Sequence, residues 1–347
     1  MHCHLLLPDL FWPERELRDI YRDLDTPALE RLLAKGRRKS DDADAESTAA
    51  WLCRRFGVER QTDWPVAPFC LLADGGEPGG RHWLRADPVH LRLDGNQLVL
   101  ADSGVFSVTQ QEAVQLADSL NAHFSADGLA FYPLRPDRWY LRTERAPALE
   151  TTPLAEAAGR SIDALLPRGA DASIWRARLN EIQMLLHGHA VNEARESAGE
   201  LPINSVWPWG GGELRDTAAA KFNAVWSRDA LAAGLARSAH IAAHDLPDSA
   251  VDLLRASASQ SVNLILLDRL CGAAQYGDAH RWRENLAQLE RDWFAPLLEA
   301  LRQERIGMLS LHALGAGGAF SVEVTRGDLR RFWRRVKPLL AYVEGLS

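Results

Sequence analysis

A short apolar segment that ends in three consecutive glycines limits the fold of this chain more than any other feature of the sequence. Residues 203–209 read Ile-Asn-Ser-Val-Trp-Pro-Trp, and Gly210, Gly211 and Gly212 follow at once. The apolar run predicts a buried strand, and glycines permit a tight turn or a close approach of two backbones. Bare backbone amides at the carboxyl end of a strand suit an anion, whereas a tight turn after a buried strand is the simpler interpretation.

A helix is expected directly before this strand. Trp175, Leu179, Ile182 and Leu186 recur at helical spacing and therefore lie on one helix face. A Gly-Glu-Leu-Pro connection at 199–202 then leads into the strand. The predicted unit is a helix, a short connection, a strand and a glycine loop.

Composition and charge exclude several classes of protein. The chain has 347 residues, of which 46% are hydrophobic and 25% charged, as in globular proteins with one large or two ordinary domains. A net charge of -7 argues against nucleic-acid binding and against a basic membrane-surface role. The four cysteines show no C-x-x-C spacing, and the sequence has neither a signal-peptide pattern nor an apolar run of about 18 residues. We expect a cytoplasmic protein with no nucleic-acid or membrane partner.

Strands alternate with helices along most of the chain. The predicted strands are 3–7, 223–226, 262–268, 306–311 and 320–324. The predicted helices are 17–24, 27–35, 48–55, 229–239, 280–302 and 329–343. This alternation favours an α/β fold with a largely parallel sheet that is covered on both faces.

The pattern changes between residues 62 and 145. A strand is expected at 69–73, a hairpin around Asp94-Gly95, a helix at 110–124, and strands at 129–132 and 138–141. These elements predict a compact α+β domain at 62–145. It would be inserted into an α/β core made of residues 1–61 and 146–347.

Several motifs occur in a fixed order along the chain. They are Leu5-Leu6-Leu7-Pro8-Asp9, Thr26-Pro27-Ala28-Leu29-Glu30-Arg31-Leu32, His189-x-x-Asn192-x-x-Arg195, the segment from Asn204 to Gly212, and Gln288-Leu289-Glu290-Arg291-Asp292-Trp293-Phe294. They resemble the motifs of archaeal-type cofactor-independent phosphoglycerate mutases of the alkaline phosphatase superfamily. The block at 83–91 also resembles a proteobacterial branch, the regulatory proteins of the RpfE type. The resemblance implies an alkaline-phosphatase-like, doubly wound, mostly parallel sheet.

The same resemblance implies a chemistry. Mutases of this kind transfer a phosphoryl group through a serine and two divalent cations, usually manganese, held by aspartate and histidine. Asp9, Asp268 and His312 match metal-ligand positions, and Ser47 lies near the position of the serine. The match departs from the pattern at the neighbouring positions, where for example Leu10 replaces the glycine that follows the first aspartate.

Further departures affect the ligands themselves. Leu311 replaces an aspartate, Gln275 or Tyr276 replaces a histidine, and no histidine follows His312. Leucine, glutamine and tyrosine do not replace carboxylate and imidazole without loss of metal affinity. The surviving residues also have structural interpretations, such as an N-cap for Ser47.

Two functions remain open. The favoured one is a non-catalytic, regulatory or ligand-binding relative, a pseudoenzyme with a degenerate metal site and no cofactor. It would bind a phosphorylated metabolite or a protein partner, with Arg195, Asn204 and the three glycines as anion contacts. The alternative is an active metal-dependent phosphoglycerate mutase or phosphohydrolase that interconverts 3-phosphoglycerate and 2-phosphoglycerate. It would use manganese or another divalent metal with a rearranged site of Asp9, Ser47, Asp268 and His312.

Overall fold

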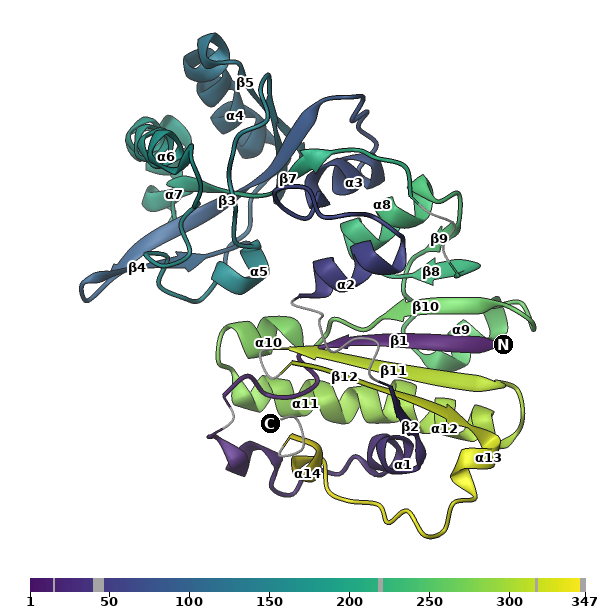
Figure 1. The fold of residues 1–347 in the computed structure, drawn as a ribbon. Coiled ribbons are helices and arrows are strands. Elements are labelled where there is room, and N and C mark those ends of the chain that lie inside the picture. Colours follow the sequence, from purple (N-terminus) through teal and green to yellow (C-terminus); the bar gives the residue numbers. More distant parts are fainter. Residues whose placement is uncertain (15, 40–46, 218–220, 316–317, 344–347) are drawn as a thin grey trace. The chain divides into compact units, whose positions relative to one another are not determined.

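The structure is a computed structural model, and its described residues are 1–14, 16–39, 47–217, 221–315 and 318–343. The chain divides into two compact units (Figure 1). The core unit comprises residues 1–57 and 218–347, and the inserted unit comprises residues 58–217. Within the described residues, no helix is long and apolar enough to cross a membrane.

The core unit is built on a mixed sheet with the order β2-β12-β11-β1-β10-β8-β9. Its strands are β1 (His2–Pro8), β2 (Arg37–Lys39), β8 (Ala224–Trp226), β9 (Ala242–His244), β10 (Val262–Leu266), β11 (Met308–Gly315) and β12 (Gly318–Thr325). β1, β8, β9, β10 and β11 run parallel, while β12 and β2 are antiparallel to their neighbours. This sheet confirms the predicted α/β fold with a mostly parallel sheet.

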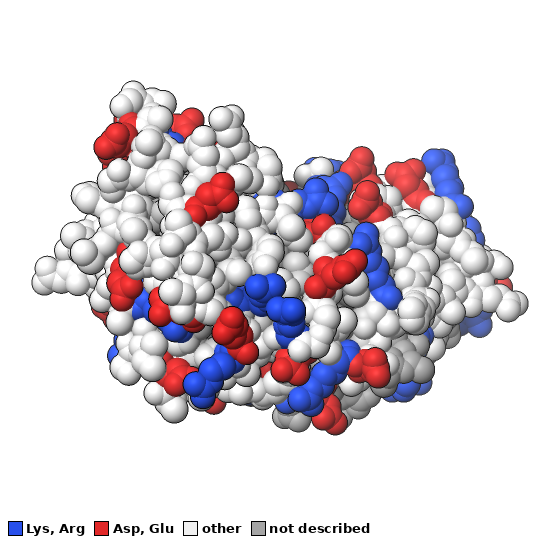
Figure 2. Space-filling model, turned by 90° about the horizontal axis from the view of Figure 1, so that it is seen from above, with Lys and Arg blue, Asp and Glu red and all other residues white. Residues whose placement is uncertain are grey.

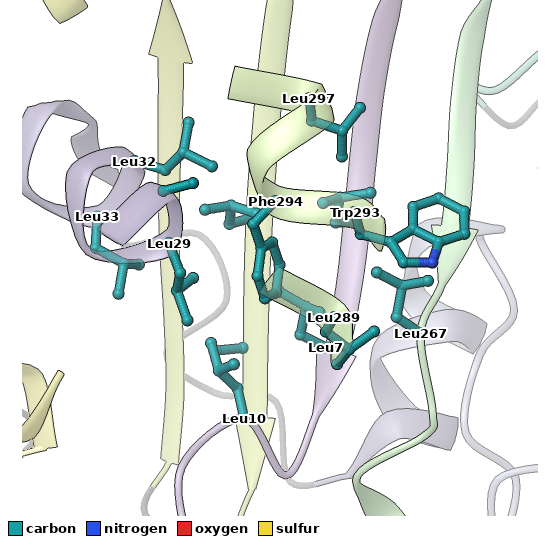
Figure 3. Packing of buried hydrophobic residues seen from close by; sticks show 14 of the residues in the cluster. Leu7, Leu10, Leu29, Leu32, Leu33, Leu267, Leu289, Trp293, Phe294 and Leu297 are labelled. Carbon is teal, nitrogen blue, oxygen red and sulfur yellow. The ribbon is translucent and has the colours of Figure 1, made fainter. Parts of the chain in front are cut away.

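Helices cover both faces of this sheet. They are η1 (Arg18–Tyr21), α1 (Pro27–Lys35), α2 (Thr48–Arg55), α8 (Ala230–Ser238), α9 (Ala250–Ala256), α10 (Cys271–Gln275), α11 (Ala279–Leu289), α12 (Ala295–Arg302), α13 (Arg326–Leu329) and α14 (Leu340–Val343). Figure 1 shows α2 and α8 on one side of the sheet and α1, α11 and α12 on the other. Alternate residues of β1 face the side with α1, α11 and α12. On this side Leu7 packs with Leu289 and Phe294 (Figure 3).

The predicted long helix at 280–302 is continuous but contains one wide turn. A π-helical turn, Glu290–Phe294, joins α11 to α12. The side chain of Glu290 is buried and accepts hydrogen bonds from the backbone N–H groups of Ala28 at 2.6 Å and Leu29 at 3.1 Å. Glu290 therefore caps the first turn of α1, where unpaired amides favour a negative charge.

Two other predicted helices of the core unit are much shorter in the structure. The pattern at 17–24 forms only η1, and the predicted helix at 329–343 forms only α13 and α14 at its two ends. In the second case, helical spacing would place Arg330 beside Arg334 and Arg331 beside Arg335, and like charges at this spacing destabilise a helix. Pro338 further prevents a continuous helix.

The inserted unit contains a second, antiparallel sheet with the order β4-β3-β6-β5, and β7 pairs with β3. Its strands are β3 (His82–Asp94), β4 (Gln97–Ala101), β5 (Leu129–Arg135), β6 (Arg138–Thr143) and β7 (Ser205–Glu213). Its helices are α3 (Val66–Ala73), α4 (Gln110–Phe124), η2 (Ser125–Asp127), α5 (Leu154–Ala157), α6 (Ala172–His187) and α7 (Ala190–Ser197). The hairpin at Asp94-Gly95 and the helix at 110–124 occur where they were predicted.

The inserted unit is larger than the domain predicted at 62–145. Residues 146–217 also belong to it. Within them, β7 pairs with β3 along its length, from Ser205 opposite Val89 to Glu213 opposite His82. The strand predicted at 69–73 is wrong, since these residues form the second half of α3. Short buried apolar runs have the same composition in strands and in helices, so the periodicity does not distinguish them.

The predicted glycine loop is part of a strand instead. Gly210, Gly211 and Gly212 lie within β7. A Cβ atom on Gly210 would lie 2.8 Å from Cβ of Val66, and one on Gly212 would lie 2.5 Å from Cβ of Pro65. The glycines therefore allow α3 and the residue before it to approach the backbone of β7 closely.

Candidate functional site

The residues predicted to contact an anion take part in the packing of the inserted unit. The buried guanidinium of Arg195 donates to Glu112 at 2.8 Å and to the carbonyl oxygens of Ser107 at 2.9 Å and Leu201 at 2.8 Å. These contacts connect α7 with α4 and with the loop before each of α4 and β7. Nε, Nη1 and Nη2 of Arg195 thus each donate to an oxygen atom of the protein.

Asn204 has a similar structural contact. Its side-chain oxygen accepts from the N–H of Leu91 at 2.7 Å, and its amide nitrogen donates to the carbonyl of the same residue at 2.8 Å. The side chain of Asn204 therefore continues the pairing of β3 and β7 by one further step. Together with the three strand glycines, the predicted anion contacts are spread along β7 and its flanks.

Ser47 is the N-cap residue of α2. Its Oγ accepts a hydrogen bond from the backbone N–H of Ala50 at 3.2 Å, which satisfies one of the free amides of the first turn. This is the structural role that the sequence also allowed for Ser47. Residues 40–46, which precede it, lie outside the described part of the chain.

His312 lies inside the core sheet. It occupies the middle of β11, paired with Leu6 of β1. Its Nε2 is 3.1 Å from Nδ1 of His4, its Nδ1 is 3.0 Å from Oγ of Ser321, and its ring is 4.9 Å from that of Trp51. Both ring nitrogens of His312 thus have hydrogen-bonding partners within the protein.

Asp9 and Asp268, in contrast, lie at the same edge of the core sheet. Asp9 directly follows β1, and Asp268 follows β10, which is the parallel neighbour of β1. The backbone of Asp9 has a φ of 54°, an uncommon value for a residue with a side chain, and its carbonyl oxygen accepts from Nε1 of Trp282 at 2.9 Å. Asp229 follows β8 at the same edge, and Cys271 begins α10. These four side chains form the carboxyl-edge cluster.

The carboxyl-edge cluster has unusual electrostatics. Burial raises the pKa of Asp9 to about 6, although a hydrogen bond from the thiol of Cys271 opposes this shift. Burial, and then the nearby charge of Asp229, also raise the pKa of Asp268. Burial and the neighbouring carboxylates of Asp9, Asp268 and Asp229 raise the pKa of the Cys271 thiol well above its usual value. Cys271 is therefore a protonated hydrogen-bond donor at neutral pH and not a nucleophilic thiolate.

The structure places the three predicted metal ligands at two positions in the core sheet. No group of three or more His, Cys, Asp or Glu side chains in the described part of the chain is placed to hold a metal ion. Asp9 and Asp268 share an edge, but His312 pairs with Leu6, three residues before Asp9 along β1.

A hollow of about 170 Å³ lies beside the carboxyl-edge cluster. Its lining residues are Arg228, Leu246, Pro247, Asp248, Leu267, Asp268, Arg269, Leu289 and Trp293. Arg228 is 3.5 Å from Asp248, and Arg269 is 3.9 Å from Asp292. Ion pairs that long and that exposed to solvent are weak. Both guanidinium groups also attract the charge of Asp268, whose pKa they lower against the larger effect of burial.

Four residues at this edge carry no motif that marks them in the sequence. Arg228, Asp229, Arg269 and Cys271 all lie within five residues of the carboxyl end of a core strand. The rule that identified Asp9, that ligand groups follow the strands of an open α/β sheet, would have identified them too. The distribution of charge on the surface does not mark the site either. Figure 2 shows Lys and Arg interspersed with Asp and Glu on the face that it displays.

Comparison with known proteins relates the chain to one group of enzymes, although no protein-family model matches it. The 2,3-bisphosphoglycerate-independent phosphoglycerate mutase of Methanosarcina mazei is 31% identical over 137 residues, which cover 37% of this chain and 34% of that protein. A probable enzyme of the same kind from Geobacter sulfurreducens is 26% identical over 130 residues, covering 37% and 33%. The matches thus span about a third of the length of these curated relatives.

A solved structure is similar in fold. A protein from Pyrococcus horikoshii aligns with 93% of this chain and 87% of its own, with a TM-score of 0.55 and 14% sequence identity. The similarity therefore extends over both units of the chain. At 14% identity this likeness concerns the fold alone.

Proposed function

We propose that this chain, a distant relative of the archaeal-type cofactor-independent phosphoglycerate mutases of the alkaline phosphatase-like superfamily, binds a phosphorylated metabolite without converting it. One observation carries the proposal: Ser47 and His312, two of the four side chains that the resemblance assigns to phosphoryl transfer, have other partners. Ser47 caps α2, and His312 contacts His4 and Ser321 within the sheet. A serine that accepts from a helix amide and a histidine held inside a sheet support a binding role better than a catalytic one.

The hollow beside the carboxyl-edge cluster is the proposed binding site. Arg228 follows β8 and Arg269 follows β10, so both guanidinium groups lie where open α/β sheets bind their ligands. Guanidinium groups bind carboxylate and phosphate through paired hydrogen bonds. The carboxylate and the phosphate of 3-phosphoglycerate offer one partner to each arginine. A retained ligand site on this fold suits a regulatory protein of the RpfE type, which would pass the bound state on to a protein partner.

The binding experiment is isothermal titration calorimetry with 3-phosphoglycerate. We expect the wild-type chain to bind it and the variant Arg228→Gln/Arg269→Gln to bind at least about tenfold more weakly, because hydrogen bonds between charged groups contribute about 1.5–3 kcal/mol each. Arg255→Gln is the matched control, since Arg255 is also exposed in the core unit and has a single ion pair with Asp252 at 3.4 Å. Equal affinity in the double variant, or no binding by the wild type, would contradict the proposed site.

The alternative function is supported by one feature. Asp9 and Asp268 follow neighbouring strands at one edge of the core sheet, as two metal ligands of a mutase would. An active phosphoglycerate mutase or phosphohydrolase would bind manganese or another divalent metal there. This function predicts metal-dependent turnover, which the binding proposal does not.

A further inference from the structure

The segment between α13 and α14 presents large apolar side chains to solvent. Phe332 is 85% exposed, Trp333 is 66% exposed and Val336 is 46% exposed. The two aromatic rings contact each other edge to face, with centroids 5.2 Å apart. Exposed apolar side chains that adjoin one another, rather than occurring singly, mark interaction surfaces.

The same segment is strongly basic. Residues 330–337 read Arg-Arg-Phe-Trp-Arg-Arg-Val-Lys, with five cations and no acidic residue, although the whole chain has a net charge of -7. Arg330, Arg335 and Lys337 are exposed to solvent. We call residues 330–337 the basic aromatic segment.

The basic aromatic segment is fixed to the core unit. The buried ammonium group of Lys35, at the end of α1, donates to the carbonyl oxygens of Arg331, at 2.7 Å, and of Arg334. The guanidinium of Arg334 donates in return to the carbonyl oxygen of Gly36. Hydrogen bonds in both directions hold the backbone of the segment against the end of α1, so its aromatic side chains are presented by a defined structure. Figure 1 shows the segment as the yellow loop between α13 and α14.

We propose that the basic aromatic segment docks the chain on the surface of an anionic lipid bilayer. Tryptophan and phenylalanine side chains favour the interface between headgroups and acyl chains, and arginine and lysine beside them pair with anionic headgroups. Docking of this kind requires no membrane-spanning helix. The net charge of the whole chain argued against a membrane surface, but the attraction depends on the charges within a Debye length of the lipid.

The side chains favour a bilayer over a single-stranded nucleic acid. Bases bind by stacking on open aromatic faces, whereas Phe332 and Trp333 lie edge to face, with an angle of 86° between their planes. Val336 adds an aliphatic side chain, which inserts into lipid but gives a base no ring to stack on. A lipid surface therefore fits all three apolar side chains together with the cations.

Vesicle co-sedimentation of the full chain tests the proposal. We expect binding to phosphatidylcholine vesicles that contain phosphatidylglycerol, release at high salt, and little binding to vesicles of phosphatidylcholine alone. The variant Arg330→Gln/Arg335→Gln/Lys337→Gln should bind about 100-fold more weakly, because each cation near an anionic membrane contributes roughly a fivefold factor. Phe332→Ser/Trp333→Ser should also bind at least about tenfold more weakly.

Two matched controls separate docking from general effects. Leu93→Ser removes a side chain that is 76% exposed on the hairpin of the inserted unit, and Arg255→Gln removes an exposed cation from α9. Both should bind vesicles as the wild type does, and circular dichroism should show all variants folded. Absence of binding to anionic vesicles, equal binding to both kinds of vesicle, or binding only to a single-stranded oligonucleotide or to polyglutamate would overturn the proposal.

Discussion

Replacement of Asp87 by alanine is expected to lower the free energy of unfolding of the inserted unit by about 3–5 kcal/mol. Asp87 is 1% exposed. Its carboxylate accepts from Nε and Nη2 of Arg85 at 3.0 and 2.6 Å, from the N–H of Trp139 at 3.2 Å and from Nε1 of Trp209 at 2.8 Å. Alanine would leave the guanidinium of Arg85 buried without its counter-ion and two further donors without an acceptor.

Chemical denaturation followed by tryptophan fluorescence measures this loss, since Trp139 and Trp209 contact the carboxylate directly. The control is Asp94→Ala on the same strand, where the exposed side chain should contribute less than about 0.5 kcal/mol. Arg85→Met/Asp87→Leu should recover part of the stability, because it removes both charges together while the N–H groups of Trp139 and Trp209 still lose their acceptor. A cost below about 1 kcal/mol for Asp87→Ala would show that the pair does not stabilise the unit.

The second large effect depends on pH. The pKa of Asp9 is about 6 in the folded chain, against an ordinary value of 3.8. Below about pH 4 the carboxyl group of Asp9 is protonated in the folded and in the unfolded chain, so its burial does not lower the free energy of unfolding. Between about pH 4 and pH 6 the unfolded chain loses the proton and the folded chain retains it, so the free energy of unfolding falls as the pH rises. Asp9→Asn should therefore be more stable than the wild type at pH 8, by about 1–3 kcal/mol, and equally stable near pH 4.

Denaturant unfolding at several pH values measures the difference. Asp23→Asn is a matched control because Asp23 has nearly the same backbone conformation, with a φ of 56°, but an exposed side chain. It should have little effect at either pH. A variant Asp9→Asn that is less stable than the wild type at pH 8 would show that the charged carboxylate is stabilised at the sheet edge instead.

Local sequence patterns predicted most of the core unit. The strands near 3–7, 262–268 and 306–311 and the long helix at 280–302 have clear periodicity, and all are present. The pairing of β7 with β3 joins residues more than 100 positions apart, and no local pattern contains that information. For this reason the local pattern predicts the strand at 203–209 correctly but places it in the core unit, whereas β7 belongs to the inserted unit.

Only part of the candidate site could be predicted, because some of its contacts also depend on the pairing of distant strands. Asp9 and Asp268 follow strands, so the sequence indicates their position at the sheet edge. The partners of His312 come from two other strands, β1 and β12, and depend on the register of the sheet. The roles of the three glycines depend on the position of α3, whose apolar run at 66–73 does not distinguish a helix from a strand.

The most direct measurement on the proposed lack of catalysis is the metal content of the purified chain, followed by assay of 3-phosphoglycerate conversion with added manganese. We expect far less than one metal ion per chain and no formation of 2-phosphoglycerate, under conditions in which 3-phosphoglycerate binds. About two bound metal ions per chain, with turnover that is lost in Asp9→Ala, would contradict the proposal and identify an active two-metal enzyme.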